Sequence, residues 1–258
     1  MSTSVSLPAQ VDSLFAKKTM FISERTSPIT IDGEFDESAW QQAKIYSDFW
    51  VQSPVDGKLA EKQTQFQVTY DATGIYIAIL LFDDQNHVIS SLRRDDWGTS
   101  DEIGVLLDPV NKNQNGFVFG VNTAGAQTEA LLFPSNADDS WDNRWRSAVK
   151  NYEDHWTAEM FIPFKTLRFE QDNLNWGIQI IRRDPGSNES HVWSPVPRQF
   201  DHGDLGYFGD MVWDRVPQGK KGNINLIPYV SGITSKDFNG DQSQNDIQIG
   251  GDAKIGIT

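Results

Sequence analysis

The sequence predicts an all-β protein: an antiparallel β-sandwich, jelly-roll-like, with short helical turns. Many short segments have the hydrophobic pattern of strands, and turn residues separate them. No segment has sustained helical periodicity, which argues against a fold that alternates strands and helices. The 258 residues, of which 38% are hydrophobic, suffice for one large β domain or two ordinary ones.

The N-terminal elements follow in chain order. Residues 1–26 are expected to form a flexible leader. A short strand is expected at residues 29–31, and Asp36 stands where it could cap a short helix that runs through Trp40.

The next two elements predict a hairpin. Residues 65–70 alternate between apolar and polar, and a turn containing Gly74 follows them. Residues 75–82 are apolar on both faces, which is typical of a central strand. Further strands are expected at residues 103–107, 117–121, 127–133, 145–152, 156–162, 176–182 and 206–213.

The composition shifts after Trp213. Residues 217–222 are rich in Gly and Lys and predict a linker. Residues 225–230 and 246–257 then alternate weakly, a pattern typical of the strands of a membrane β-barrel. A last pair of strands in a soluble domain is the alternative.

Charge and cysteine content exclude several classes of function. The formal net charge is −14, so neither nucleic acid nor an anionic lipid surface is an expected partner. No cysteine is present, which excludes disulfides and thiolate metal sites. The longest apolar run is far too short to cross a membrane as a helix, so the sandwich is not expected to insert directly.

The nine Trp residues exceed what a core of this size needs, so some are candidates for binding. Trp40, Trp156 and Trp176 lie in apolar patterns and are expected in the core. Trp50 lies among polar residues. The segment 141–145 contains two Trp residues and could be an exposed platform or a loop over the sandwich edge.

The order of several motifs resembles the family 9 carbohydrate-binding modules. They are Ile31-Asp32-Gly33 with Trp40, Val68-Thr69-Tyr70-Asp71, Leu107-Asp108-Pro109, Phe117-Val118-Phe119-Gly120-Val121-Asn122, Trp156-Thr157-Ala158-Glu159 and Trp176-Gly177-Ile178. The resemblance implies a sandwich domain over residues 27–216. A subgroup in which such a module precedes an outer-membrane barrel is more similar still, through Leu167-Arg168-Phe169 and Ile227-Pro228-Tyr229.

That subgroup implies a location and a partner. The protein is then expected to be exported to the outer membrane, on its periplasmic or cell-surface side. Residues 217–258 are then a linker and the first strands of a truncated barrel, which is the partner of the sandwich.

The resemblance also implies a saccharide ligand and its site. In these modules two Trp rings sandwich a sugar; Trp97 and Trp193 are the candidates by position. Asn122, Arg183, Asp101 and Glu102 are the candidates for hydrogen bonds to hydroxyl groups. One departure is that family members that bind sugar usually carry Glu at the position that Gly104 occupies here.

Calcium is the cofactor that the resemblance implies. Calcium needs six to eight oxygen ligands, and the acidic loops offer such oxygens at Asp83, Asp84, Asp138 and Asp142. None of these loops has the spacing of an EF-hand.

Catalysis by this domain is not expected. The sequence has no phosphate-binding loop and no nucleophile elbow, and its four His residues lack metal spacing. Glu159 is expected to pair with an Arg rather than to act as an acid. The alternative to sugar binding is a structural domain that docks on or plugs its own barrel, or docks on a protein partner. Haem bound through Met160 or Met211 is a third hypothesis.

Overall fold

The computed structural model describes residues 15–84, 88–89, 91–134, 136–170, 172–217, 224–236 and 243–255. The chain divides into two units between residues 219 and 220. In the described part, no helix has the length and the hydropathy that crossing a membrane would require.

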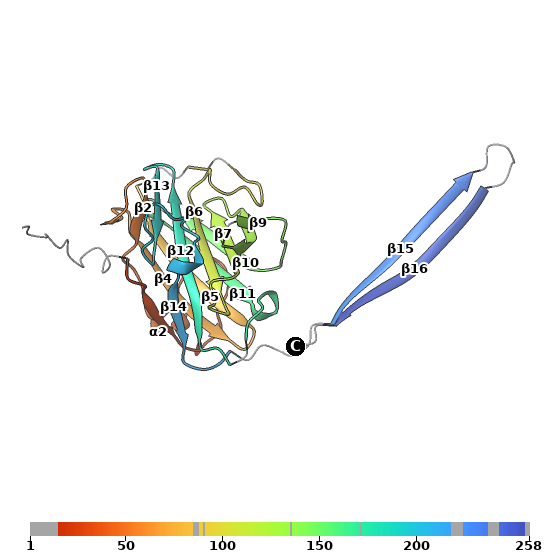
Figure 1. Ribbon diagram of the computed structural model, residues 1–258, viewed down its shortest axis with the longest axis horizontal. Coiled ribbons are helices and arrows are strands. Elements are labelled where there is room, and N and C mark those ends of the chain that lie inside the picture. Colours follow the sequence, from red (N-terminus) through yellow and green to blue (C-terminus); the bar gives the residue numbers. More distant parts are fainter. Residues whose placement is uncertain are drawn as a thin grey trace, which may run out of the picture. The chain divides into compact units, whose positions relative to one another are not determined.

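The first unit is a sandwich of two sheets, as the sequence predicts (Figure 1). The larger sheet has ten strands, in the order β3-β2-β13-β12-β6-β7-β8-β9, with β14 beside β12 and β1 beside β14. Its strands are β1 (Thr19–Ile22), β2 (Trp50–Ser53), β3 (Lys58–Leu59), β6 (Glu102–Asp108), β7 (Gly116–Asn122), β8 (Gln127–Phe133), β9 (Asn136–Asp138), β12 (Asn175–Asp184), β13 (Glu189–Val192) and β14 (Gly209–Trp213).

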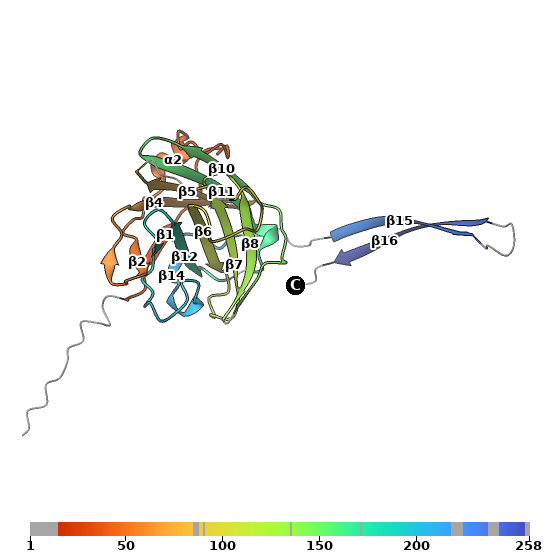
Figure 2. The same ribbon diagram turned by 90° about the horizontal axis from the view of Figure 1, so that it is seen from above.

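The smaller sheet has four strands, in the order β10-β11-β5-β4, and packs face to face on the larger one (Figure 2). They are β4 (Thr64–Asp71), β5 (Gly74–Phe82), β10 (Arg146–Asn151) and β11 (His155–Pro163). Among the described strand pairs only β1–β14 is parallel.

The core lies between the two sheets because each strand alternates its side chains. In β6 the inward residues are Ile103, Val105 and Leu107, and all three are fully buried. The predicted core residues Trp156 and Trp176 lie in the same cluster. Residues at even positions of β6 therefore face away from the smaller sheet.

Strand β5 is buried on both faces, as expected, because a segment of the chain covers the outer face of the smaller sheet. Trp40, on helix α2 (Ser38–Gln42), packs there with Tyr76 and Phe161. Beneath it Glu159 is fully buried and accepts hydrogen bonds from Trp40 Nε1 (3.0 Å) and from the backbone N of Asp32 (2.9 Å) and Gly33 (3.1 Å). The expected pairing of Glu159 with an Arg is wrong.

Several predicted boundaries also differ. Residues 29–31 form no strand, and Asp36 caps nothing, since the N-cap of α2 is Glu37 without a side-chain bond. The last strand of the sandwich begins at Gly209 because a 3₁₀ turn, η2 (Leu205–Tyr207), precedes it. A second 3₁₀ turn, η1 (Phe164–Thr166), follows β11.

The segment 141–145 is a loop packed over the sandwich edge, not an exposed platform. The Trp141 ring lies 5.4 Å from that of Phe117, and the Trp145 ring lies 5.5 Å from that of Phe119. Trp145 Nε1 donates to buried Glu129 at 3.1 Å. Both Trp residues thus extend the core at one edge.

The second unit contains one antiparallel hairpin of β15 (Ile224–Lys236) and β16 (Ser243–Ile255). Its register pairs Val230 with Ile249, and these side chains are 72% and 81% exposed. Tyr229 pairs with Gly250, and its ring lies where a side chain at Gly250 would stand.

Candidate functional site

The outer face of the larger sheet carries a row of cross-strand neighbours. Gly104 on β6 and Gly120 on β7 pair directly at its centre, so the row has a gap where side chains would stand. From β2 to β8 the row reads Trp50, Val192, Ile181, Gly104, Gly120 and Thr128.

Trp97 fills that gap. A Cβ at Gly104 would lie 2.8 Å from Cη2 of Trp97, and one at Gly120 would lie 2.4 Å from its Cζ3. The indole thus rests on bare backbone and remains half-buried, with part of its surface open to solvent. We call the paired residues Gly104 and Gly120 the seat of Trp97, because the ring fills the space that side chains at these positions would take. This accounts for Gly104 in place of the Glu that sugar-binding family members usually carry.

Hydrogen bonds fix the loop that carries Trp97. Glu102 Oε1 accepts from the backbone N of Gly98 at 2.6 Å, and Gly98 has a φ of 101°, which favours glycine. Asp95 N donates to Gln127 O at 3.0 Å, and Arg94 forms an ion pair with Glu129. The ring position is thus built into the fold.

Glu102 lies on the outer face, two residues before Gly104 on β6, in a second row of cross-strand neighbours. It is only 2% exposed. Burial raises its pKa to about 8, against the opposing charge of Arg183. Its carboxyl group therefore supports the Trp97 loop, and little of it is open to a ligand.

Arg183 is the cross-strand neighbour of Glu102 on one side and of Ser190 on the other. It is half-buried on the outer face, in the row next to Trp97's seat. Of the polar residues predicted for the site, Arg183 alone stands beside Trp97 with donors to offer.

Three predicted ligand-binding residues are wrong. Asn122 is buried: its Nδ2 donates to Ser91 O (2.9 Å), and its Oδ1 accepts from the N of Ala124 and Ala126 (3.0 Å each). Its amide closes a turn, and at 3% exposure it has almost no surface to offer a sugar.

Asp101 points away from the outer face because it precedes Glu102 in a strand-like stretch. It has no exposed surface, and its Oδ2 accepts from Val88 N at 2.6 Å. Burial raises its pKa to about 6.

Trp193 is 2% exposed and lies in the core between the sheets. Its ring lies 5.3 Å from that of Phe66 and 6.1 Å from that of Tyr46, so no face is free for stacking. The backbone N of Trp193 still bonds Ile180 O, which explains why the ring continues the inward alternation.

Sequence reasoning missed three aromatic residues near this face. Trp50 is half-buried at the β2 end of the row. Phe200 is 39% exposed, and its ring lies 4.9 Å from that of Tyr207; its carbonyl accepts from Gln52 Nε2 at 3.0 Å. Strand β2 has only four residues, which is too short for its alternation to give a signal.

The predicted calcium ligands have hydrogen-bond or ion-pair partners within the protein. Lys62 Nζ lies 2.7 Å from Asp83 and 2.8 Å from Asp84, so an ammonium group already pairs with both carboxylates. Asp138 accepts from Ser140, and Asp142 lies 3.2 Å from Arg94. Within the described ranges no three acidic or His side chains gather as metal ligands, and calcium binding stays a prediction.

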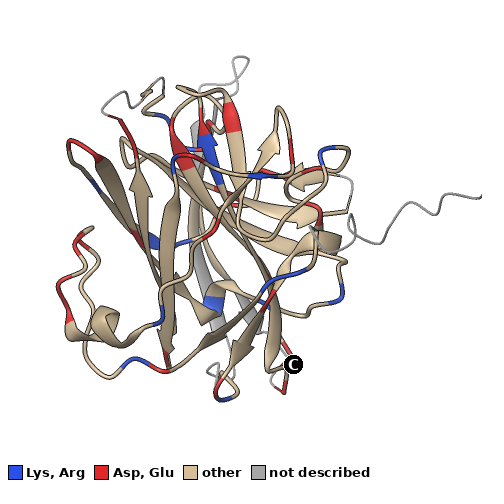
Figure 3. Ribbon diagram, turned by 90° about the vertical axis from the view of Figure 1, so that its left-hand side faces the viewer, with Lys and Arg blue, Asp and Glu red and all other residues tan. Residues whose placement is uncertain are grey.

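Charged residues lie mostly in loops and near strand ends (Figure 3).

Met160 and Met211, the residues considered for haem, are fully buried in the core between the sheets. Neither offers a sulfur atom at the surface.

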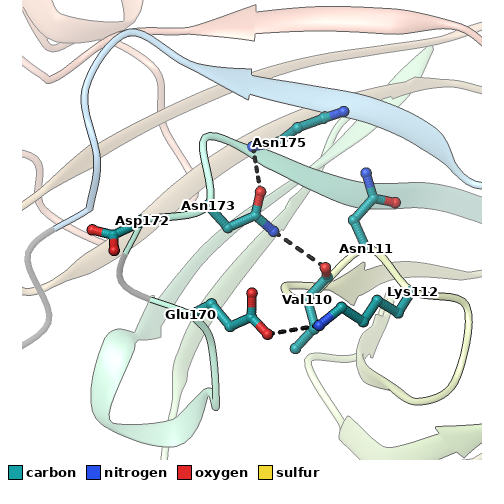
Figure 4. Close-up of a pocket in the computed structure, with 7 residues that line it drawn as sticks. All are labelled: Val110, Asn111, Lys112, Glu170, Asp172, Asn173 and Asn175. Atoms are coloured by element: carbon teal, nitrogen blue, oxygen red, sulfur yellow. Dashed lines mark hydrogen bonds and ion pairs between the residues drawn. The ribbon is translucent and has the colours of Figure 1, made fainter.

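A separate cavity of about 420 Å³ lies at the end of the sandwich where β12 begins (Figure 4). Several of its polar groups bond one another: Lys112 Nζ lies 2.8 Å from Glu170, and Asn173 Nδ2 donates to Val110 O at 3.3 Å. No aromatic ring lines it. It is therefore a poorer sugar site than the outer face near Trp97.

Solved structures that share this fold include three carbohydrate-binding or related proteins. A family 9 carbohydrate-binding module from Caldicellulosiruptor kristjanssonii, in complex with glucose, has a TM-score of 0.56 at 17% identity and covers 81% of this chain and 100% of its own. A cellotriose complex of a family 9 module from that organism has a TM-score of 0.54 at 16% identity, with 79% and 95% covered. A proposed carbohydrate-binding protein from Bacteroides uniformis has a TM-score of 0.62 at 11% identity, with 77% and 100% covered.

No curated protein matches the chain in sequence. Residues 31–212, which include both sheets apart from β1 and the last residue of β14, match the family described as carbohydrate family 9 binding domain-like. This is a family of non-catalytic binding domains, which supports the expectation that the sandwich is not an enzyme. The chain therefore belongs to the family 9 carbohydrate-binding domain-like proteins.

Proposed function

We propose that the sandwich binds a saccharide on the outer face of its larger sheet, beside Trp97. The observation that carries the proposal is the seat of Trp97 on Gly104 and Gly120, which holds a part-open aromatic ring in place on a sheet face. Membership of the family, and the glucose and cellotriose in the related structures, support it.

The chemistry of the face suits a sugar. The open surface of the indole stacks on the C–H groups of a pyranose ring, and Arg183 donates hydrogen bonds to oxygen atoms beside it. Ile181 and Val192, which stand between Trp97 and Trp50 in the row, are buried in a second hydrophobic cluster with Val196, Leu205 and Phe208, so the surface open to a sugar lies at Trp97 and Arg183. A shallow, wet site of this kind gives micromolar to millimolar affinity.

Isothermal titration of the whole chain against mono- and oligosaccharides, beginning with glucose and cellotriose, tests the proposal. We expect saturable binding, and we expect Trp97→Ala to weaken it at least roughly tenfold because the stacking surface is lost. Calcium is included throughout, and a parallel titration with EDTA shows whether calcium contributes.

The matched control is Tyr152→Ala, which removes a ring that is 41% exposed in the turn before β11 of the smaller sheet. It should bind like the wild type. If the folded wild-type protein binds no saccharide at millimolar concentration, the proposal is wrong and a docking domain is the remaining function.

We also propose that the second unit begins a membrane barrel, which places the exported sandwich at the outer membrane. The support is the face pattern of its hairpin. Val230 and Ile249 pair on one face with Ile247 beside them, and all three are more than 70% exposed. Ser231 and Gln248 pair on the opposite face. Apolar and polar faces alternate in this way in barrel strands, and 13 residues exceed the 9–11 that such a strand needs.

A detergent-partitioning experiment tests this second proposal. Val230→Asp with Ile249→Asp should reduce partitioning of the whole chain into detergent micelles, because charge on a lipid-facing surface is costly. Ser231→Asp with Gln248→Asp places the same charges on the opposite face and should have little effect. Equal partitioning of both double variants would contradict the proposal.

A further inference from the structure

Arg183 differs from every other basic residue that the structure describes. Among the described Lys and Arg side chains, it is the one that is half-buried and makes no hydrogen bond or ion pair. The other half-buried bases are bonded: Lys18 to backbone carbonyls, and Arg25, Lys62 and Lys150 to carboxylates. A guanidinium that has lost part of its water without gaining a partner is costly, because the lost hydration is not replaced.

Three carboxyl groups on the strands around Arg183 have other partners. Glu102, its neighbour across the strand pair, bonds Gly98 N and has almost no exposed surface. Burial raises the pKa of Glu102 to about 8, so near neutral pH this group is largely uncharged and leaves the guanidinium uncompensated. Glu189 pairs with Lys58 and His191, and Asp184 bonds Lys62 and Ser187.

We propose that the ligand is an acidic saccharide, whose carboxylate pairs with the guanidinium of Arg183 while its ring stacks on Trp97. The proposal rests on the proposed function, since it names the class of sugar that the same site takes. It also assigns a role to Arg183 that a neutral sugar would not require.

Position and chemistry support the pairing. Glu102 and Gly104 are successive residues of β6 on one face, so the rows of Arg183 and Trp97 lie roughly 7 Å apart along the strands. Ring and guanidinium can therefore contact one small molecule. A guanidinium presents parallel N–H donors that match the two oxygen atoms of a carboxylate, and such charge-assisted bonds are about twice as strong as neutral ones.

Sugars that differ only in the carboxylate measure its contribution to binding. The whole chain is titrated with glucose, glucuronate and the methyl ester of glucuronic acid, and with the corresponding galactose and mannose series. We expect at least one uronate to bind roughly tenfold more tightly than its uncharged ester and its parent sugar, with a preference that shrinks as salt is added. Arg183→Gln should abolish the preference for the uronate, so that the uronate and its ester bind this variant with affinities within about twofold of each other.

The matched control is Arg168→Gln, which makes the same change of charge at an exposed residue beyond the opposite end of β12. It should keep the preference. If the wild type binds parent sugars and uronates equally, or if Arg183→Gln keeps the preference, the acidic ligand is wrong and saccharide binding stands. If no sugar of any series binds, the proposed function itself is wrong, and this inference with it.

Discussion

Two buried carboxyl groups, Glu159 and Glu102, hold segments of chain against opposite outer faces of the sandwich. Glu159 gathers three donors from the segment over the smaller sheet, and Glu102 accepts from the loop over the larger sheet. Burial raises the pKa of both groups, to about 7 and about 8. Both groups therefore link folding to pH.

The sign of this linkage is set by the raised pKa. Between the ordinary value of a Glu carboxyl and about 8, folded Glu102 holds a proton that the unfolded chain releases, so its contribution to stability falls as pH rises. Glu102→Gln keeps the shape and an acceptor but does not titrate.

We therefore expect the wild type to lose stability relative to Glu102→Gln as pH rises from about 5 to about 8.5. Each unit of pKa displacement corresponds to about 1.4 kcal/mol, so the difference in unfolding free energy should change by more than roughly 1 kcal/mol. Urea unfolding at several pH values measures it. Glu153→Gln, at an exposed turn, is the control, and parallel pH profiles for wild type and Glu102→Gln would contradict the assignment.

At the same scale, the sequence locates Trp97 and Arg183 but not their surroundings. Trp193 and Asn122 fit the motif order equally well, yet burial removes both from the surface. Burial depends on which strands become neighbours, and β13 and β2 are too short to show their pairing in the sequence. Trp50, on β2, was left out of the predicted site for the same reason.

At the scale of elements, β6 and β7 together form the seat of Trp97. A Cβ at Gly120 would lie closer to the ring (2.4 Å) than one at Gly104 (2.8 Å), so a methyl group there must displace the indole. The position of the ring is a property of the strand pair and not of either residue alone.

Alanine substitutions at the seat should therefore weaken saccharide binding in a graded way. We expect Gly120→Ala to reduce affinity several-fold, and Gly104→Ala to reduce it less, because the smaller overlap displaces the ring less. Titration calorimetry measures the affinities, and near-ultraviolet circular dichroism reports the Trp environment. Unchanged affinity in Gly120→Ala would show that the seat does not position the ring for binding.

The long elements were predictable and the short ones were not. Strands β5, β6, β7 and β11 have seven to nine residues, enough to show an apolar face or an apolar run. Residues 29–31 look like a strand, but their apolar side chains pack against Trp40 and no neighbouring strand pairs with them. The apolar pattern of residues 29–31 therefore predicted correctly that these side chains pack against the protein. It predicted wrongly that their backbone pairs with a strand.

At the scale of the whole molecule, the sandwich has a complete core of its own. Among the residues whose side chains the structure describes, the main cluster contains members from β1 to β14 and none beyond Trp213. The order of motifs in the sequence was sufficient to predict the sandwich, since the pattern runs through the entire domain. The nature of the second unit stays a prediction.

A chain that ends at residue 217 should therefore fold and melt within a few degrees of the full chain. The expected reason is that the free energy of burial lies within the sandwich core. Differential scanning calorimetry of both chains measures this. A loss of cooperative melting in the shorter chain would show that the second unit is required for the fold.

The pairing of β14 has a mechanical consequence. This last strand lies between β12, which is antiparallel to it, and β1, which is parallel, and its Trp213 ring packs 4.7 Å from that of Trp176. A pull on the chain at residue 217 acts along β14, while the ladder bonds on both sides run across it. A force along β14 therefore acts on all of these hydrogen bonds at the same time, in shear, and does not break them one after another. Because Arg183 lies near the other end of β12, a ligand held there would load the sandwich along its strands, the direction in which it resists extension best.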